Sequence, residues 1–196
     1  MEVKMIGVIL AGGESKRFGA NKGFACYQGK PFYEHSIKAV AECVHQTILV
    51  TNPTLYSIYK EKINIQVMKD VFEYQGCGPL AGLYTAMQTV EADWYMILPV
   101  DVPLMDQKII HRLMQFADNK FEAVIPEING KKQPLIALYH QSIQSKVYDQ
   151  LVNNDLKMMN LLSILSAKYV SEDQIGERSH FHNINTVKDY ETYVKS

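Results

Sequence analysis

The sequence has little cysteine and almost no net charge. Its three cysteines, Cys26, Cys43 and Cys77, are odd in number and lack paired spacing, so they do not indicate a disulfide framework. No CxxC motif or Cys/His cluster suggests a zinc site. Twenty Lys and Arg residues against 21 Asp and Glu residues leave a net charge of −1. This balance gives no global field to attract nucleic acid or an anionic membrane, so we expect neither as a partner.

Long apolar runs and repeats are also missing. The apolar stretch 5–11 is far too short to span a bilayer. It follows Lys4 as a signal-peptide core would. However, it lacks a cleavage site and runs into Gly12-Gly13 and charged residues, which favours a strand followed by a loop. We therefore expect a cytoplasmic protein. Its 196 residues, 47% of them hydrophobic, predict a single domain spanning residues 1–196.

Apolar runs of strand length alternate with helical patterns along the chain. Strands are expected near residues 5–10, 47–51, 65–68, 94–98, 123–126, 134–139 and 168–170, with a hairpin turn at Gly130. Helices are expected near residues 31–43, 55–61, 79–90, 107–116, 143–153 and 158–165, with a last one from Thr186. This alternation is typical of an open parallel sheet with right-handed crossovers. We therefore predict an α/β fold, a Rossmann-like three-layer sandwich with a mostly parallel central sheet.

Glycine and polar residues stand where several of the predicted strands end. They are Gly12-Gly13, Asn52, Asp70 and Asp101. In an open parallel sheet, ligands bind beyond the carboxyl ends of the strands. These positions are far apart in the sequence, but we expect them to share one crevice.

The stretch after the first strand, LAGGESKRFGANKG, combines paired glycines with cations. Gly12 and Gly13 would let backbone N–H groups approach a phosphate, while Arg17 can bridge two phosphate oxygens. Lys22 would add a point charge. A solvated basic turn is the alternative, but this spacing is more specific than a charge run and favours phosphate binding. Neither the GxGxxG fingerprint nor the GxxxxGK[ST] pattern is present, so neither a dehydrogenase nor an ATPase is indicated.

Asp101 follows the apolar run WYMIL and precedes Val102-Pro103. A carboxylate at the mouth of a buried strand is poorly placed for packing. It is well placed to hold Mg²⁺ against triphosphate oxygens. A helix N-cap or a turn aspartate is the other interpretation. The glycine loop favours the metal site, because a loop that binds phosphates and a carboxylate that binds Mg²⁺ are expected together where a triphosphate is bound.

Five stretches of the sequence together resemble one family. LAGGESKRFGANKG is similar to the LAGGxSxRMGxxK signature that several nucleotidyltransferases share, and GPLAGLYTAM, PVDVP, QPLIALY and FHNINT follow in the expected order. QPLIALY and FHNINT are the discriminating ones. Over nearly its whole length the chain resembles the molybdenum cofactor guanylyltransferases, the MobA family. The resemblance implies a nucleotidyltransferase fold. It also implies the transfer of GMP from GTP to Mo-molybdopterin with release of pyrophosphate.

The resemblance also implies roles for individual positions. Those that would contact the nucleotide are Leu10, Ala11, Gly12, Gly13, Lys22, Asn52, Asp70 and Asp101. Catalysis would rest on Arg17 at the departing pyrophosphate, on Lys22 at the phosphates and on Asp101 as the ligand of Mg²⁺, the expected cofactor. Asn183 and Asn185 would lie toward the pterin. Asp70 and backbone carbonyls near Leu10 are the candidates for recognising guanine.

Two alternatives stay open. A molybdopterin cytidylyltransferase, or another NTP transferase acting on a phosphorylated small molecule, would have the same loop, because the loop contacts phosphates and cannot choose the base. A non-catalytic nucleotide sensor on the same fold could lose Asp101, whereas an enzyme that uses Mg²⁺ could not. We expect GTP and molybdopterin as substrates, a monomer, and transient contact with proteins that insert or deliver the molybdenum cofactor.

Overall fold

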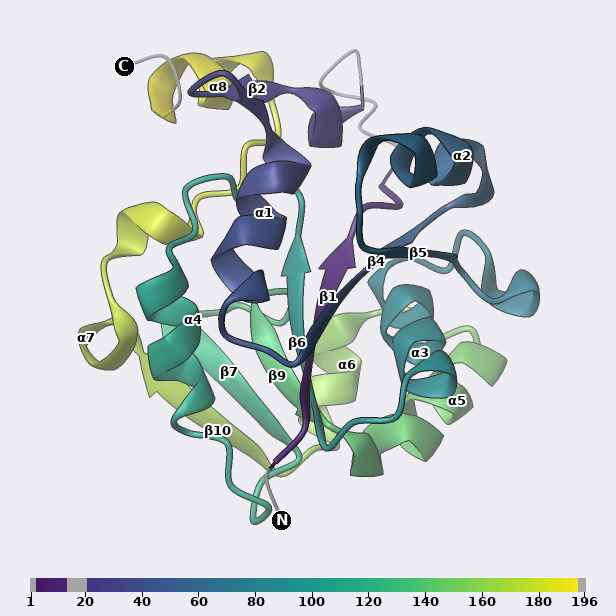
Figure 1. Ribbon diagram of the computed structural model, residues 1–196. Helices are drawn as coiled ribbons and strands as arrows, with labels where there is room; N and C mark the ends of the chain where they lie inside the picture. Colours follow the sequence, from purple (N-terminus) through teal and green to yellow (C-terminus); the bar gives the residue numbers. More distant parts are fainter. Residues whose placement is uncertain (1–2, 14–20, 194–196) are drawn as a thin grey trace.

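The first apolar run of the sequence forms the centre of a β-sheet in the computed structural model, which describes residues 3–13 and 21–193 (Figure 1). Strand β1 (Met5–Leu10) pairs in parallel with β4 (Gln46–Thr51) on one side and with β6 (Trp94–Pro99) on the other. The four inner residues of β1 are buried. A strand covered on both faces needs such a continuous apolar run, as the sequence predicts.

The main sheet has eight strands, in the order β10-β7-β9-β6-β1-β4-β5, with β8 paired to β7. The remaining strands are β5 (Gln66–Lys69), β7 (Ala123–Ile128), β8 (Lys131–Lys132), β9 (Ala137–His140) and β10 (Ala167–Ser171). Strands β1, β4, β5 and β6 run parallel to one another, whereas β9 is antiparallel to both β6 and β7. A separate hairpin pairs β2 (Cys26–Tyr27) with β3 (Lys30–Pro31).

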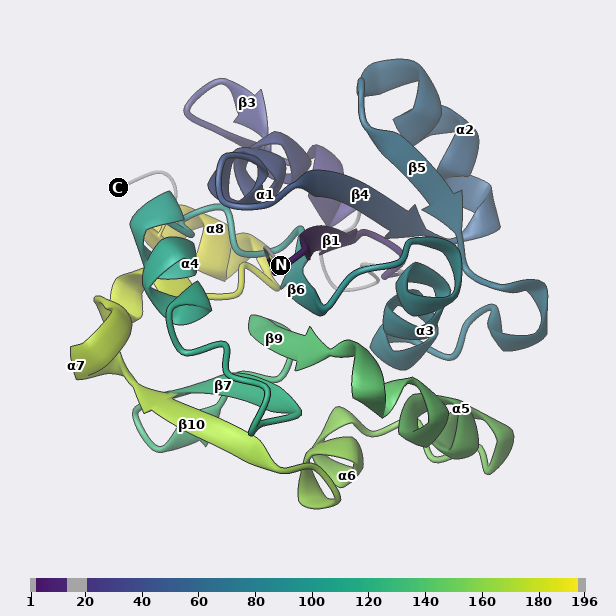
Figure 2. The same cartoon turned by 60° about the horizontal axis from the view of Figure 1, so that its bottom comes forward.

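Helices cover both faces of this sheet (Figure 2). The α-helices are α1 (Phe32–Ala41), α2 (Pro53–Lys62), α3 (Pro79–Thr89), α4 (Gln107–Met114), α5 (Gln144–Val152), α6 (Met158–Ser163), α7 (Glu172–Ile175) and α8 (Val187–Tyr193). Short 3₁₀ helices are η1 (Lys22–Phe24), η2 (Phe72–Tyr74), η3 (Gln141–Ile143) and η4 (Arg178–Phe181). The predicted α/β three-layer sandwich with a mostly parallel central sheet is confirmed.

The alternation of side chains along β1 divides the core into two clusters. Ile6 and Val8 pack in the cluster that α3, α5 and α6 cover. Ile9 packs in the opposite cluster, to which α1, α2, α4 and α7 contribute. Every helix that flanks the sheet therefore rests on apolar residues of the central strands, which holds the carboxyl ends of those strands at one edge.

The expected elements all have a counterpart, with one boundary that is wrong. The predicted strand 134–139 begins only at Ala137, because Pro134 has no N–H to give a ladder. Residues 134–136 instead form a turn in which Ile136 N–H donates to the Gln133 carbonyl at 3.1 Å. The hairpin turn at Gly130 is confirmed, with positive φ at both Asn129 and Gly130. Within the described residues, no helix has the length and apolar character needed to cross a membrane.

Gly7 generates a prediction about how α1 packs on β1. A Cβ built at Gly7 would overlap Cγ1 of Val40 and lie 3.3 Å from Cγ2 of Val44. Valine side chains in a helix are stiff, so they cannot move aside freely. We expect Gly7→Ala to lower the free energy of unfolding by about 1–3 kcal/mol, measured by urea denaturation. In a Val40→Ala background, where the obstructing methyl groups are gone, Gly7→Ala should cost much less; equal costs in the two backgrounds would contradict this packing.

Candidate functional site

A cavity of about 480 Å³ lies at the carboxyl ends of the parallel strands. All eight positions that the sequence analysis expects at a nucleotide line this cavity: Leu10, Ala11, Gly12, Gly13, Lys22, Asn52, Asp70 and Asp101. Its volume is in the range of small-ligand sites in proteins. The expectation that the ends of β1, β4, β5 and β6 share one crevice is therefore confirmed as geometry.

The turn after β1 is held by polar groups at the end of β4. Thr51 Oγ1 donates to the Ala11 carbonyl at 3.1 Å, and Asn52 Nδ2 donates to the Gly12 carbonyl at 2.9 Å. Asn52 Oδ1 also accepts from Leu55 N–H at 3.0 Å and so caps α2. Asn52 thus ties the glycine turn to a helix N-terminus. A contact from Asn52 to a nucleotide stays a prediction.

Lys22 is placed by an aromatic cluster under η1. The Phe24 ring stacks on Tyr59 with centroids 4.8 Å apart and meets Tyr33 edge-on at 5.6 Å. Gly23 N–H donates to Asn21 Oδ1 at 3.0 Å, and a Cβ at Gly23 would overlap the Tyr59 hydroxyl oxygen. The backbone around Lys22 is therefore held from both sides, which leaves its long side chain to reach the cavity.

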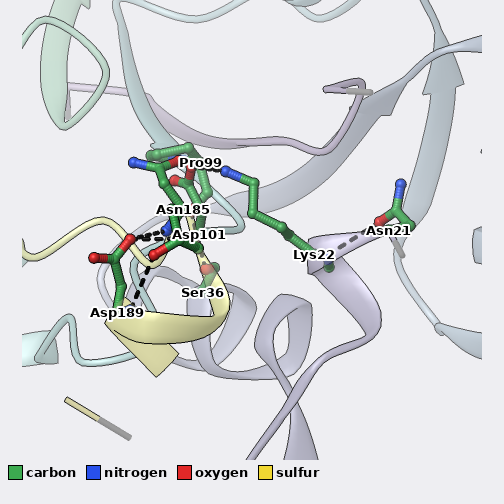
Figure 3. A network of polar contacts seen from close by, with 9 residues as sticks. Asn21, Lys22, Ser36, Pro99, Asp101, Asn185 and Asp189 are labelled. Carbon is green, nitrogen blue, oxygen red and sulfur yellow. Dashed lines mark hydrogen bonds and ion pairs between the residues drawn. The ribbon is translucent and has the colours of Figure 1, made fainter. Parts of the chain in front are cut away.

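The Lys22 ammonium group joins two segments that are far away in the sequence (Figure 3). Its Nζ lies 2.8 Å from Asp101 Oδ2 and donates to Asn185 Oδ1 at 2.5 Å. The side chains of Lys22 and Asp101 are only 15% and 18% exposed. This ion pair is therefore largely shielded from solvent, where it is screened less than a surface pair.

Three hydrogen bonds to backbone carbonyls hold the end of β6 around Asp101. Val100 N–H donates to the Leu10 carbonyl at 3.2 Å, and Ile184 N–H donates to the Asp101 carbonyl at 2.8 Å. Ser36 Oγ, on α1, donates to the Pro99 carbonyl at 3.1 Å. The Asp101 Oδ1 atom is buried, and no group of the described residues donates to it. A buried carboxylate oxygen with no partner is suited to binding a cation.

A metal ion at Asp101 would need further ligands from outside the described protein groups. Among residues 3–13 and 21–193 there is no group of three or more His, Cys, Asp or Glu side chains that could hold a metal ion. Mg²⁺ is commonly bound by one or two carboxylates, with substrate phosphates and water completing the shell. A single aspartate beside a phosphate-binding turn fits that pattern.

Asp70 occupies the end of β5 in the same cavity. Two glycines leave room beside its carboxylate: a Cβ at Gly12 would come 3.8 Å from Oδ2, and one at Gly82 would come 3.9 Å from Oδ1. Burial disfavours the charged form and raises the pKa of Asp70 to about 6. Among the described residues, none forms an ion pair or a hydrogen bond with this carboxylate, so its acceptor capacity is open to a ligand.

The two asparagines expected near the acceptor are placed differently. Both are exposed and neither lines the cavity, but Asn185 accepts a hydrogen bond from Lys22, which does line it. Arg17 lies outside the described residues, so its expected role stays a prediction.

Sequence reasoning did not connect Asp189 with the site. In the sequence, Thr186 followed three residues later by Asp189 is close to a capping box, and the structure shows a reciprocal pair of hydrogen bonds between these two residues. That local signal could not show that the capped turn presents Asn185 to Lys22.

A glycine turn, a lysine and a carboxylate at the carboxyl ends of parallel strands form the kind of arrangement by which α/β proteins bind nucleotides. The family model of the MobA-like NTP transferase domain matches residues 7–168. The chain belongs to this family, as the sequence motifs predict.

Relatives support this membership over nearly the full chain. A protein of Bacillus anthracis named "Probable molybdenum cofactor guanylyltransferase" is 37% identical over 188 residues, which cover 95% of this chain and 94% of the relative. Molybdopterin-guanine dinucleotide biosynthesis protein A from Archaeoglobus fulgidus has a similar structure, with a TM-score of 0.84, 20% identity and 97% of both chains covered.

A second solved structure has a similar architecture. CMP:2-keto-3-deoxy-manno-octonic acid synthetase, solved in complex with CTP, aligns with a TM-score of 0.75 at 15% identity, over 98% of this chain and 97% of its own. At such low identities the likeness concerns the fold alone. The predicted nucleotidyltransferase fold is confirmed.

The raised pKa of Asp70 predicts a pH-dependent stability in the absence of ligand. A carboxyl group whose pKa is higher in the folded state contributes stability that is fully present below about pH 4 and is lost as the pH rises through about 6. Asp70→Asn removes the buried charge. It should therefore raise the free energy of unfolding at pH 8 by about 1 kcal/mol, after allowing for screening by solvent, and have little effect near pH 4.

Urea denaturation at several pH values measures this difference. The exposed Asp149 on α5 provides the control, since Asp149→Asn should show no such trend. The same effect of Asp70→Asn at pH 4.5 and at pH 8 would contradict the burial of this carboxylate.

Proposed function

We propose that this protein is a nucleotidyltransferase that transfers GMP from GTP to Mo-molybdopterin, forming Mo-molybdopterin guanine dinucleotide and releasing pyrophosphate. The observation that carries the proposal is the match over 95% of the chain to a relative named as a molybdenum cofactor guanylyltransferase. The cavity supports it, because a glycine turn, Lys22 and Asp101 converge where a triphosphate would lie.

The chemistry needs no nucleophile from the protein. An oxygen of the terminal phosphate of the pterin attacks the α-phosphorus of GTP and forms a new P–O bond. The bond from this phosphorus to the oxygen that bridges to the β-phosphate breaks, and pyrophosphate leaves with the bonding electrons. The chain contributes by positioning two anions against each other and by neutralising their charge.

Three parts of the site would share this work. The turn at Gly12 and Gly13 would present backbone N–H groups to the phosphates, since these residues have no side chain in the way. The Lys22 ammonium group, which lines the same cavity, would neutralise phosphate charge. Arg17 is predicted to stabilise the departing pyrophosphate, and Asn183 and Asn185 are predicted to lie toward the pterin.

MobA-like nucleotidyltransferases generally depend on a divalent metal ion. We propose that the ion is Mg²⁺ and that Asp101 is its protein ligand, because the buried Oδ1 has no donor among the described residues. When bound, Mg²⁺ would supply positive charge to the triphosphate. Asp101 would contribute the carboxylate oxygen, and Lys22 would be released from it toward the phosphates.

Base selection would rest on Asp70 and on backbone carbonyls near Leu10. Guanine presents a ring N–H and an exocyclic amine, and a carboxylate can accept hydrogen bonds from both. Asp70 suits this role because its carboxylate faces the cavity without a partner among the described residues. An unpaired buried acceptor penalises a base that cannot donate to it.

Other expectations rest on the sequence alone and stay proposals. We infer one catalytic domain over residues 1–196, present in the cytoplasm as a monomer that takes GTP and molybdopterin as its substrates. Transient contact with proteins that insert or deliver the molybdenum cofactor belongs with these inferences.

The first functional prediction concerns Asp101. Asp101→Asn removes the negative charge that would hold Mg²⁺, so pyrophosphate release with GTP, Mg²⁺ and molybdopterin should fall by about 10²–10⁴-fold. Within residues 3–13 and 21–193, the exposed Asp118 forms an ion pair only with Lys120, at 3.5 Å, and Asp118→Asn should leave turnover unchanged. Near-normal turnover of Asp101→Asn would contradict the assignment of Asp101 as the ligand of Mg²⁺.

The second functional prediction concerns the base. With molybdopterin as acceptor, kcat/KM should favour GTP over CTP and ATP by at least about a hundredfold. Competition assays that follow each dinucleotide product measure this ratio directly. If CTP is the better substrate, the protein is a cytidylyltransferase with the same fold and loop. If no triphosphate is consumed although one binds, a nucleotide sensor is the better description.

A further inference from the structure

Among the described residues, the Lys22 ammonium group contacts one charged and one neutral side chain, and they come from different segments. Asp101 Oδ2 lies 2.8 Å from Nζ, and Asn185 Oδ1 accepts a hydrogen bond at 2.5 Å. A carboxylate both orients a lysine and neutralises it, whereas an amide oxygen orients it and leaves its charge available. If Asp101 turns to a cation, Asn185 can still hold the Lys22 ammonium group toward an anion.

The position of Asn185 depends on a carboxylate four residues further along the chain (Figure 3). Asp189 Oδ2 accepts from the backbone N–H of Asn185 at 3.0 Å and from that of Thr186 at 2.8 Å. In return, Asp189 N–H donates to Thr186 Oγ1 at 3.0 Å. This reciprocal cap fixes the backbone from which the Asn185 side chain projects.

The same turn is anchored at both of its ends. Ile184 is fully buried, and its N–H donates to the Asp101 carbonyl. On the other side, the Tyr190 hydroxyl donates to the Cys26 carbonyl at 2.5 Å, and its ring stacks on Phe32 with centroids 6.1 Å apart. The turn therefore bridges the end of β6 and the β2–β3 hairpin, which follows directly on the segment that carries Lys22.

We propose that Asp189 is a positioning residue for phosphate binding: it fixes Asn185, and Asn185 holds the Lys22 ammonium group toward the nucleotide phosphates. This inference rests on the proposed function, because it assumes that Lys22 meets those phosphates. It adds a C-terminal element to the nucleotide half of the site. The turn at residues 185–189 then links the side of the site that faces the acceptor with the side that binds the phosphates.

Direct attraction between the negative charge of Asp189 and Lys22 is a second explanation for an effect of Asp189 on GTP binding. The experiment has to separate it from positioning through Asn185. Burial raises the pKa of Asp189, but hydrogen bonds with Thr186 and with the amide of Asn185, together with the charge of Lys22, lower it by more. The carboxylate therefore also feels Lys22 directly. Both backbone N–H groups use a single oxygen, Oδ2, so an asparagine at position 189 can keep both hydrogen bonds without the charge.

The experiment measures binding of GTP and of guanosine by calorimetry in the presence of Mg²⁺, without acceptor, so that Asp101 has a cation to bind and no transfer can occur. Asp189→Ala and Asn185→Ala should each weaken GTP binding about tenfold, the scale of one hydrogen bond to a charged group. Guanosine binding should not change, because guanosine has no phosphate for Lys22 to meet. Asp189→Asn should bind GTP with nearly the same affinity as the protein without substitutions. Glu191→Ala, an exposed position on the same helix, is the matched control and should have no effect.

A double-mutant cycle with Lys22→Ala decides whether Asp189 acts through Lys22. In the Lys22→Ala background, Asp189→Ala should cause no further loss of GTP affinity. Additive losses, or an equal loss of guanosine binding, would show a merely structural role and overturn the proposal. A loss in Asp189→Asn as large as in Asp189→Ala would show that charge and not position matters, and would also overturn it.

Asn185→Ala keeps the cap intact and therefore tests the same link if Asp189→Ala fails to fold. Failure of the proposed function gives a different result. In that case the cycle would show coupling in GTP binding, but no pyrophosphate would be released when molybdopterin and Mg²⁺ are added.

Discussion

The parallel register of β1 between β4 and β6 is the constraint on which the rest of the site depends. Leu10 lies opposite Val50 on one side and Pro99 on the other, so the three strands end at the same level. The residues that follow them, the glycine turn, Asn52 and Asp101, are thereby brought to one edge although about 90 residues of chain separate the first from the last. Parallel strands need long crossovers, and the helices that form these crossovers bury the sheet on both faces.

The charged side chains at the carboxyl ends of the strands are placed so that a ligand can contact them in place of other protein groups. Lys22 and Asp101 pair in a largely shielded position, yet one oxygen of Asp101 and the whole carboxylate of Asp70 have no donor among the described residues. Burial without partners is unfavourable for a carboxylate, which explains why the pKa of Asp70 is raised. A cation at Asp101 and a base that donates N–H groups to Asp70 would each give a buried carboxylate the partner that it lacks. The site is therefore suited to a ligand that brings a cation to Asp101 and hydrogen-bond donors to Asp70, as we propose for a nucleotide with its metal ion.

Much of the fold could be predicted because its signals are local. The buried run Met5–Leu10, the proline that opens α3 and the turn at Gly130 each act over a few residues, and each lies where the pattern indicates. The β2–β3 hairpin and α7 were not anticipated, because strands of two residues and a helix of four carry no periodic signal. The strand expected from residue 134 was shortened by Pro134, whose missing N–H is itself a local property.

The order of the longer strands and helices, the glycine turn, and the acidic and amide residues at strand ends can be predicted from the sequence, because hydrophobic periodicity and backbone freedom are properties of short segments. Which of these residues meet depends on how the segments pack in three dimensions. Asn185 stands 163 residues after Lys22 and accepts its hydrogen bond because the buried Ile184 and the Tyr190 anchor set the path of the turn between them. The raised pKa of Asp70 likewise depends on burial, which no single segment creates. Such distances are set by the packing of segments that are far apart in the sequence, so a local sequence pattern cannot predict them.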